Sequence, residues 1–222
     1  MVRIDIRGPI IPNDYKDVYD YFQMESTAPI DIRKALEKAS DIEPIDVYID
    51  SGGGEIHSGS DIYTDLMNHQ NVNIYVVGLA ASAASVIAMA GHLEMSPTAM
   101  MMIHNVSTVT GGDYREMDKA SRTLQAANKS MASAYVRKSG MSEAEALKMM
   151  DEETWITAQR AVELKLADGI MFEEEKQSLV AAYNSGMLSL KKIEETKAKI
   201  NAKKEKTVME QEKINLLKLR RL

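Results

Sequence analysis

The chain has 222 residues, of which 45% are hydrophobic, and its 27 basic and 33 acidic side chains give a net charge of −6. This composition allows one compact domain plus an appendage, and no apolar run reaches the roughly 18 residues that a membrane span requires. The chain has no cysteine, which excludes disulfides, thiol catalysis and thiolate metal sites, and the acidic balance argues against nucleic acid as the main partner.

Short apolar strands alternate with helical segments along residues 1–172. The predicted strands cover 2–6, 45–50, 73–77, 99–104 and 170–172. The predicted helices cover 31–39, 57–68, 82–90, 113–138, a short stretch from 142, and 158–164. We expect Asp31 to cap the first of these helices. Repeated ββα and βαβ units of this kind predict an α/β fold with a mainly parallel sheet and helices on both faces.

The composition changes after residue 172. Residues 191–222 hold 11 Lys/Arg and 5 Glu, a balance of +6, whereas residues 1–190 carry −12. We therefore predict a folded domain over 1–172 and a charged helical tail over 173–222 that is mobile or binds a partner. The first residues lack a basic segment followed by an apolar one, so we expect no signal peptide and a cytoplasmic protein.

Three segments that could carry chemistry follow predicted strands. Ser51-Gly-Gly-Gly54 ends one strand, Ser82 follows the next within Gly78-Leu-Ala-Ala-Ser82-Ala-Ala84, and His104 ends Met102-Ile-His104. Alone, each has a structural explanation: a tight turn, a helix N-cap and a packed histidine. Together they are harder to explain as packing, because a serine nucleophile needs a base within reach, and open backbone amides can receive negative charge.

The other three histidines are weaker candidates. His57 and His69 lie on a predicted surface helix and His92 follows a glycine turn. Their scattered spacing does not predict a metal site, and no cofactor motif is present.

These segments resemble the proteolytic subunit of the Clp protease, the ClpP family. Family members carry a Ser-Pro-Gly-Gly turn, a Gly-x-Ala-Ala-Ser nucleophile motif and a Met-Ile-His base motif, which the three segments match in order. Residues 155–168 are also similar to the family's Phe-Leu-Ser-Ala segment. The match runs from residue 4 to residue 172 and implies a ClpP/crotonase-like fold, with residues 113–138 as a protruding handle helix.

The resemblance implies a serine endopeptidase that cleaves proteins or peptides. It assigns Ser82 as nucleophile, His104 as general base, and the backbone amides of Gly53 and Ala83 as the oxyanion hole. The family's acid is an Asp at the position of Glu153, so Glu153 is the expected third member. Asp151 and Glu152 are alternative acids.

The resemblance also implies a homo-oligomer, a heptameric ring or double ring. The chain begins at the first predicted strand and has a charged tail, features similar to phage and prophage members that process scaffold or capsid proteins in head maturation. On this reading the protein acts in a bacterial host's cytoplasm, and an ATPase partner is not expected.

Two other classes of function stay open. A ClpP-like protein with a decayed site could serve as a structural or scaffold component, and the replacement of Asp by Glu153 motivates this alternative. An acyl-CoA enzyme of the crotonase fold or a Ser–Lys peptidase fits less well, because neither needs the pairing of the serine and histidine motifs.

Overall fold

The computed structural model describes residues 2–40 and 43–173. Its strands are β1 (Val2–Arg7), β2 (Ile45–Ser51), β3 (Val72–Ala81), β4 (His92–Met95), β5 (Met100–Ile103), β6 (Thr154–Thr157) and β7 (Gly169–Ile170). Its helices are a 3₁₀ turn at Asn13–Tyr15, α1 (Lys16–Tyr21), α2 (Pro29–Leu36), α3 (Ile56–Met67), α4 (Ala83–Ala88), α5 (Tyr114–Ser139), α6 (Glu143–Asp151) and α7 (Ala158–Glu163). The predicted α/β fold with a mainly parallel sheet is confirmed.

The sheet is parallel in the order β1-β2-β3-β4-β7, and β5 branches from β3. The long strand β3 changes neighbour along its length: residues 73–76 pair with β4, and residues 79–81 pair with β5. The strand β6 then pairs with β5 in the antiparallel direction. This change of neighbour brings the ends of β3 and β5 together.

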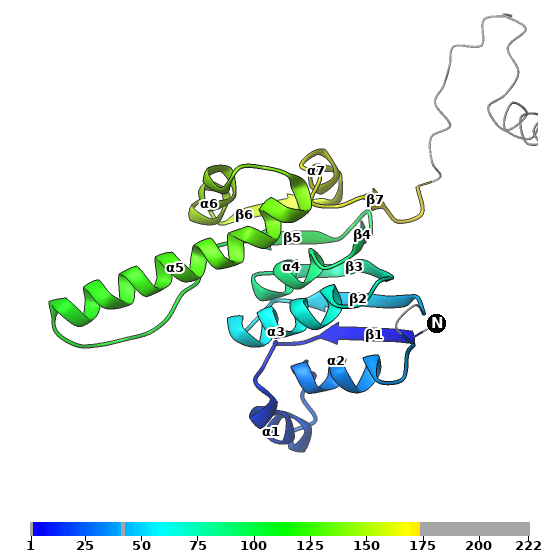
Figure 1. The fold of residues 1–222 in the computed structure, drawn as a ribbon, viewed down its shortest axis with the longest axis horizontal. Coiled ribbons are helices and arrows are strands. Elements are labelled where there is room, and N and C mark those ends of the chain that lie inside the picture. Colours follow the sequence, from blue (N-terminus) through cyan, green and yellow to red (C-terminus); the bar gives the residue numbers. More distant parts are fainter. Residues whose placement is uncertain (1, 41–42, 174–222) are drawn as a thin grey trace, which may run out of the picture. The chain divides into compact units, whose positions relative to one another are not determined.

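Buried apolar residues recur along the chain at the spacing expected for strands and helices. Ile45, Val47 and Ile49 alternate on β2 and are fully buried, as are Ile74 and Val76 on β3. Contacts run from α2 to α3, from α3 to α4 and from α4 to α5, so these helices form a row along the sheet (Figure 1). The smallest of them, α4, is buried along all six of its residues, which explains its alanine-rich sequence.

The longest helix, α5, projects from the body (Figure 1). Asp113 and Glu116 form a capping box at its start, and Gly140 ends it with φ of 77°. Its buried side chains, Ala132, Ala134 and Tyr135, all lie in its last third. The predicted handle-like helix is therefore confirmed as a helix packed at one end only.

Several local predictions differ from the structure. The helix α2 begins at Pro29 instead of residue 31, and Asp31, its third residue, accepts a hydrogen bond from the Ala28 amide at 3.0 Å. The segments that form α1, β4 and β6 were not predicted, because each is short and β4 and β6 depend on neighbouring strands. The predicted helical tail lies outside the described residues, apart from residue 173.

In the part of the chain that the structure describes, no helix is both long enough and apolar enough to cross a membrane.

Asp168 directly precedes β7, and its carboxylate links this strand to β4 and to α5. Its carboxylate accepts a hydrogen bond from the Leu93 amide at 2.7 Å and one from Lys138 at the end of α5. Burial raises the pKa of this carboxyl, but the Lys138 and Leu93 hydrogen bonds and the charges of Lys138 and His92 outweigh burial, and the net pKa is lowered. The ionised form therefore stabilises the fold.

We expect Asp168→Asn to lower the free energy of unfolding by about 1 kcal/mol at about pH 7, since solvent screens this half-exposed ion pair. A folded pKa below the ordinary 3.8 gives stabilisation that is present above that value and lost as pH falls through the folded pKa. Urea unfolding should therefore show a smaller difference between wild type and variant at about pH 3 than at about pH 7. A difference that does not change with pH would contradict the role of the ionised carboxylate.

Candidate active site

Ser82 lies at the junction of β3 and α4 with an unusual backbone. Its φ of 54° and ψ of −124° belong to a region that residues with a side chain rarely adopt. Its amide donates to the Met102 carbonyl at 2.9 Å, and its carbonyl accepts from the Ser85 amide at 3.0 Å. These bonds hold the strained turn and fix the direction of the hydroxyl.

His104 follows β5 and faces Ser82. The parallel pairing of Ala81 with Met102 brings the two strand ends together, and His104 Nε2 lies 2.8 Å from Ser82 Oγ. Both side chains are half-buried. An imidazole at this distance can accept the hydroxyl proton as the oxygen attacks an electrophile, so the pair has the geometry of an activated nucleophile.

Ser85 and Tyr135 form a second hydrogen-bonded pair, which supports the turn at Ser82. Ser85 Oγ donates to the Ser82 carbonyl at 2.6 Å and lies 2.8 Å from the Tyr135 hydroxyl. Tyr135 comes from α5, and burial raises its pKa although the Ser85 hydrogen bond acts in the other direction. A neutral, fully buried tyrosine thus connects α5 to the backbone of Ser82.

The glycine turn after β2 lies against the same site. A side chain built on Gly53 would lie 2.7 Å from Ser82 Cβ and 2.9 Å from the Ala83 amide nitrogen, and its φ is +89°, so only glycine fits there. Ala83 is the first residue of α4, where an amide has no partner within the helix. The Gly53 amide, however, donates to Ser51 Oγ at 3.1 Å.

The three candidate acids differ in position. Because β6 pairs Thr154 with Ile103, the same register continued by one residue places Glu153 opposite His104. In the described residues Glu153 makes no side-chain hydrogen bond or ion pair, and its φ is 49°. Asp151 instead accepts a hydrogen bond from Asn105 at 2.8 Å, and Glu152 lies 3.8 Å from Lys148.

Asn105 anchors the loop that follows His104. Besides donating to Asp151, it accepts a bond from Asn128 Nδ2 at 2.8 Å, and Asn128 Oδ1 accepts from the Val106 amide at 2.7 Å. The residue next to the base is thus held from α5 and from α6. Sequence reasoning missed the roles of Asn105 and Asn128, because neither an asparagine in a loop nor one in a long polar helix carries a local signal of the contact between them.

The remaining histidines make other contacts. His69 lies 3.1 Å from the Ser40 carbonyl, and His92 lies 3.5 Å from Asp168. His57 is the second residue of α3, and its amide donates to the Glu55 carboxylate. Across residues 2–40 and 43–173, no three His, Cys, Asp or Glu side chains gather in a way that could hold a metal ion.

Comparisons with known proteins identify the family of this chain. The family model described as Clp protease matches residues 26–174. The chain is 33% identical over 144 residues to the ATP-dependent Clp protease proteolytic subunit 1 of Chlamydia muridarum, covering 62% of this chain and 74% of that protein. It is 27% identical over 175 residues to the ATP-dependent Clp protease proteolytic subunit of Mesostigma viride, covering 77% of this chain and 76% of that protein.

We expect Ser85→Ala to lower the free energy of unfolding by about 1–3 kcal/mol, because it leaves the buried Tyr135 hydroxyl without a partner. Combining it with Tyr135→Phe removes that orphaned group, so the double variant should be no less stable than Ser85→Ala alone. Urea unfolding measures Ser85→Ala, Tyr135→Phe and the double variant, with Ser133→Ala on the exposed face of α5 as a control that should change stability by under about 0.5 kcal/mol. Strictly additive losses would show that the two hydroxyls do not interact.

Proposed function

Since the chain belongs to the Clp protease family, we propose that it is a serine endopeptidase with Ser82 as the nucleophile. Membership of the family implies a peptidase. The observation that carries the serine mechanism is the 2.8 Å contact between Ser82 Oγ and His104 Nε2. Without a base at this distance, a serine hydroxyl is a poor nucleophile at neutral pH.

In the proposed reaction, Ser82 Oγ forms a bond to the carbonyl carbon of the substrate while His104 Nε2 accepts its proton. The imidazolium then donates that proton to the amine as the C–N bond breaks. Water attacks the acyl-enzyme, again losing a proton to His104, which returns it to Ser82 Oγ as the acid product leaves.

The oxyanion of each tetrahedral intermediate is proposed to bind the amides of Ala83 and Gly53. The position of Ala83 at the start of α4 supports its role. For Gly53 the proposal requires that its amide turn from Ser51 Oγ toward the substrate oxygen. One such donor contributes about 10²–10³ to the rate in other serine peptidases, so this reorientation would have a measurable effect.

We assign the acid of the triad to Glu153 and give Asp151 a positioning role. The strand register favours Glu153, since Thr154 pairs with Ile103 at the end of the β5–β6 ladder and Glu153 is the next residue on the side of His104. Asp151 already accepts the Asn105 amide, so its carboxylate acts on His104 through the next residue along the chain. Such an acid orients the imidazole and stabilises its protonated form.

The biological setting is also a proposal: cleavage of scaffold or capsid protein in phage head maturation. The Lys/Glu-rich residues 173–222 support it, because they resemble the tails of phage-encoded members. Clp proteases form oligomeric rings, and we propose a heptameric ring or double ring for this chain. The exposed first half of α5 supports this assembly, because it leaves a long helical surface available for other copies.

The alternative is a ClpP-like structural or scaffold protein with an inactive site. One observation favours it, namely that the Gly53 amide is occupied by Ser51 and not directed to a substrate. In that case the pairing of Ser82 and His104 would be a remnant without turnover.

We expect a fluorophosphonate probe to label the wild-type protein covalently at Ser82, since His104 activates this hydroxyl. Ser82→Ala should abolish both labelling and cleavage of an unfolded protein substrate. Ser121→Ala, which changes an exposed serine on α5, should leave both unchanged. Intact-mass spectra and light scattering on the same samples measure labelling and particle size. An assembled wild-type protein that is neither labelled nor active would favour the inactive alternative.

The two carboxylates can be separated by matched amide variants. Glu153→Gln should lower kcat/KM about 10²–10⁴-fold, because the amide cannot stabilise the imidazolium, and Glu153→Asp should restore part of the activity. Asp151→Asn keeps an oxygen that can accept from Asn105, so we expect a loss below about tenfold. Steady-state hydrolysis of one peptide measures each variant. The reverse order of effects would make Asp151 the acid.

A further inference from the structure

A segment that the family model does not match follows β1 at the edge of the sheet that carries the proposed site. The model matches from residue 26, whereas residues 13–25 hold the 3₁₀ turn, α1 and the turn after it. Because β1 and β3 run parallel in one sheet, their ends at Arg7 and Ala81 lie at the same edge (Figure 1). The segment is therefore on the side of the domain where Ser82 follows β3.

A backbone hydrogen bond connects the start of this segment to the glycine turn beside Ser82. The Ile10 amide donates to the Gly53 carbonyl at 2.9 Å, and a side chain built on Gly53 would lie 2.7 Å from Ser82 Cβ. Neighbouring strands are about 4.8 Å apart and an extended residue spans about 3.4 Å, so Asn13 lies within about 20 Å of Ser82. By the same spacing, an extended substrate reaches this segment about six residues from the bond at Ser82.

Residues 13–25, here named the α1 surface, concentrate exposed apolar side chains. Five of the eleven exposed large apolar side chains in the described part of the chain lie in this segment. Tyr21 is 80% exposed and Phe22 65%, and their rings meet edge to face with centroids 5.2 Å apart. The other three are Tyr15, Val18 and Met24. A cluster of this kind on a folded domain marks a binding surface more often than an isolated exposed residue does.

The α1 surface is also acidic. It has four carboxylates and one lysine, a balance of −3. Lys16 bonds to Asp20 at 2.8 Å and is only 21% exposed, so its charge is largely balanced within the segment. Asp14, Asp17 and Glu25 are exposed and make no side-chain ion pair with the described residues. Charge complementarity therefore favours an occupant that is both basic and apolar.

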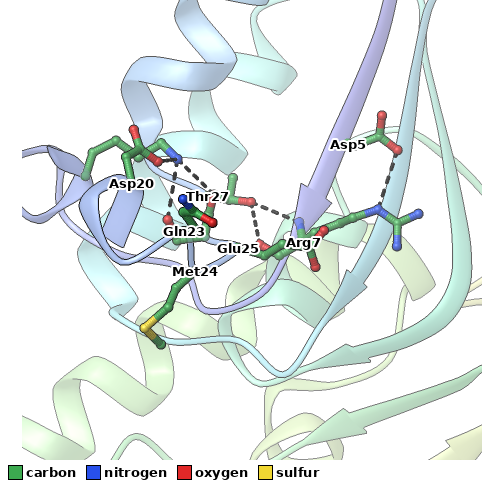
Figure 2. A pocket seen from close by; sticks show the side chains of 9 residues that line it. Asp5, Arg7, Asp20, Gln23, Met24, Glu25 and Thr27 are labelled. Carbon is green, nitrogen blue, oxygen red and sulfur yellow. Dashed lines mark hydrogen bonds and ion pairs between the residues drawn. The ribbon is translucent and has the colours of Figure 1, made fainter. Parts of the chain in front are cut away.

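A hollow of about 380 Å³ adjoins this surface (Figure 2). Asp20 lies on one side of it, and Asp5 and Arg7 lie on the other. Both cations that line the hollow are paired: Arg7 lies 3.8 Å from Asp5 and 3.7 Å from Asp50, and Lys16 bonds to Asp20. The hollow thus extends the acidic surface inward, toward the end of β1, without adding an unpaired cation.

We propose that the α1 surface binds a basic, apolar segment of the protein substrate, about six residues from the bond that Ser82 cleaves. The inference rests on the proposed peptidase function and names the class of substrate. Aliphatic side chains of the substrate cover Tyr21 and Phe22, and its Lys or Arg side chains face Asp14 and Asp17. A second α1 surface is disfavoured as the occupant, because two surfaces of −3 repel each other, and the same repulsion disfavours nucleic acid and anionic membranes.

The distance from Ser82 determines which kinetic constant this contact changes. A contact about six residues from the reacting bond is the same in the bound substrate and in the transition state. It therefore lowers KM and leaves kcat unchanged, in contrast to a loss of the nucleophile or the base.

Three peptides that share one cleavable core test the proposal. The first is the bare core. The second carries Leu-Lys-Leu-Leu-Arg at both ends, beginning about six residues from the cleaved bond, and in the third Glu replaces each Lys and Arg of these extensions. With the wild-type protein we expect KM for the basic peptide to be at least about fivefold lower than for the acidic peptide, with kcat equal within about twofold.

Variants of the α1 surface should remove this preference. Asp14→Lys with Asp17→Lys should bring the two KM values within about twofold of each other and leave kcat/KM for the bare core unchanged. Tyr21→Ser with Phe22→Ser should raise KM for the basic peptide at least about threefold, because the apolar contact is lost. All four side chains are exposed, and circular dichroism checks that the fold is kept.

A matched control adds the same charge elsewhere. Glu37→Lys with Glu163→Lys changes two exposed carboxylates at the ends of α2 and α7, where a cation suits the helix C-terminus, and should keep the preference. Fluorescence anisotropy of the labelled basic peptide on Ser82→Ala protein measures binding without cleavage. Its Kd should rise at least about fivefold when Asp14→Lys and Asp17→Lys are added.

The outcomes separate this inference from the proposed function. A bare core that is cleaved, with equal KM values for the basic and acidic peptides, would overturn the inference alone, as would a preference lost equally in the control variant. A bare core that the assembled wild-type protein does not cleave would count against the peptidase function. In that case equal Kd values for the basic and acidic peptides on Ser82→Ala protein would overturn the binding surface as well.

Discussion

The arrangement of the site depends on the change of neighbour along β3. Its first half pairs with β4 and its second half with β5, and only the second pairing places Ser82 beside His104. Gly78 lies where the strand passes from one neighbour to the other. A side chain there would lie 2.4 Å from an Asp50 carboxylate oxygen, which itself accepts the Leu79 amide at 3.0 Å. The small residue and the aspartate together allow the sheet to branch at this point.

The helix α5 supports both residues of the proposed catalytic pair. Tyr135 reaches the Ser82 carbonyl through Ser85, and Asn128 holds Asn105 and the Val106 amide beside His104. These contacts come from the part of α5 near the body, while its first half is exposed. A force on the projecting half, such as contact with another copy, would therefore act on both the nucleophile turn and the base loop through one rigid element.

The parts of the site differ in how completely they are prepared for reaction. The proposed nucleophile and base already lie at hydrogen-bonding distance, and the strained backbone of Ser82 is held by four hydrogen bonds to its amide and carbonyl. The oxyanion and acid positions are less complete, since Gly53 donates to Ser51 and Glu153 makes no bond to His104 among the described residues. In the proposed mechanism, these are the two groups that substrate binding or assembly must still bring into place.

The sequence by itself determined the α/β class and most strands and helices, and it pointed to Ser82 and His104 as a candidate pair, because short motifs at strand ends carry that information locally. It also identified the glycine turn, since consecutive glycines are rare without a need for positive φ. Only the tertiary structure decided that Asp151 binds Asn105, that Tyr135 supports Ser85 and that α1 exposes an acidic aromatic surface. These features depend on residues 20 or more positions apart, or on what is left uncovered after packing. No local pattern records either, because contact and exposure are set by how the elements pack together.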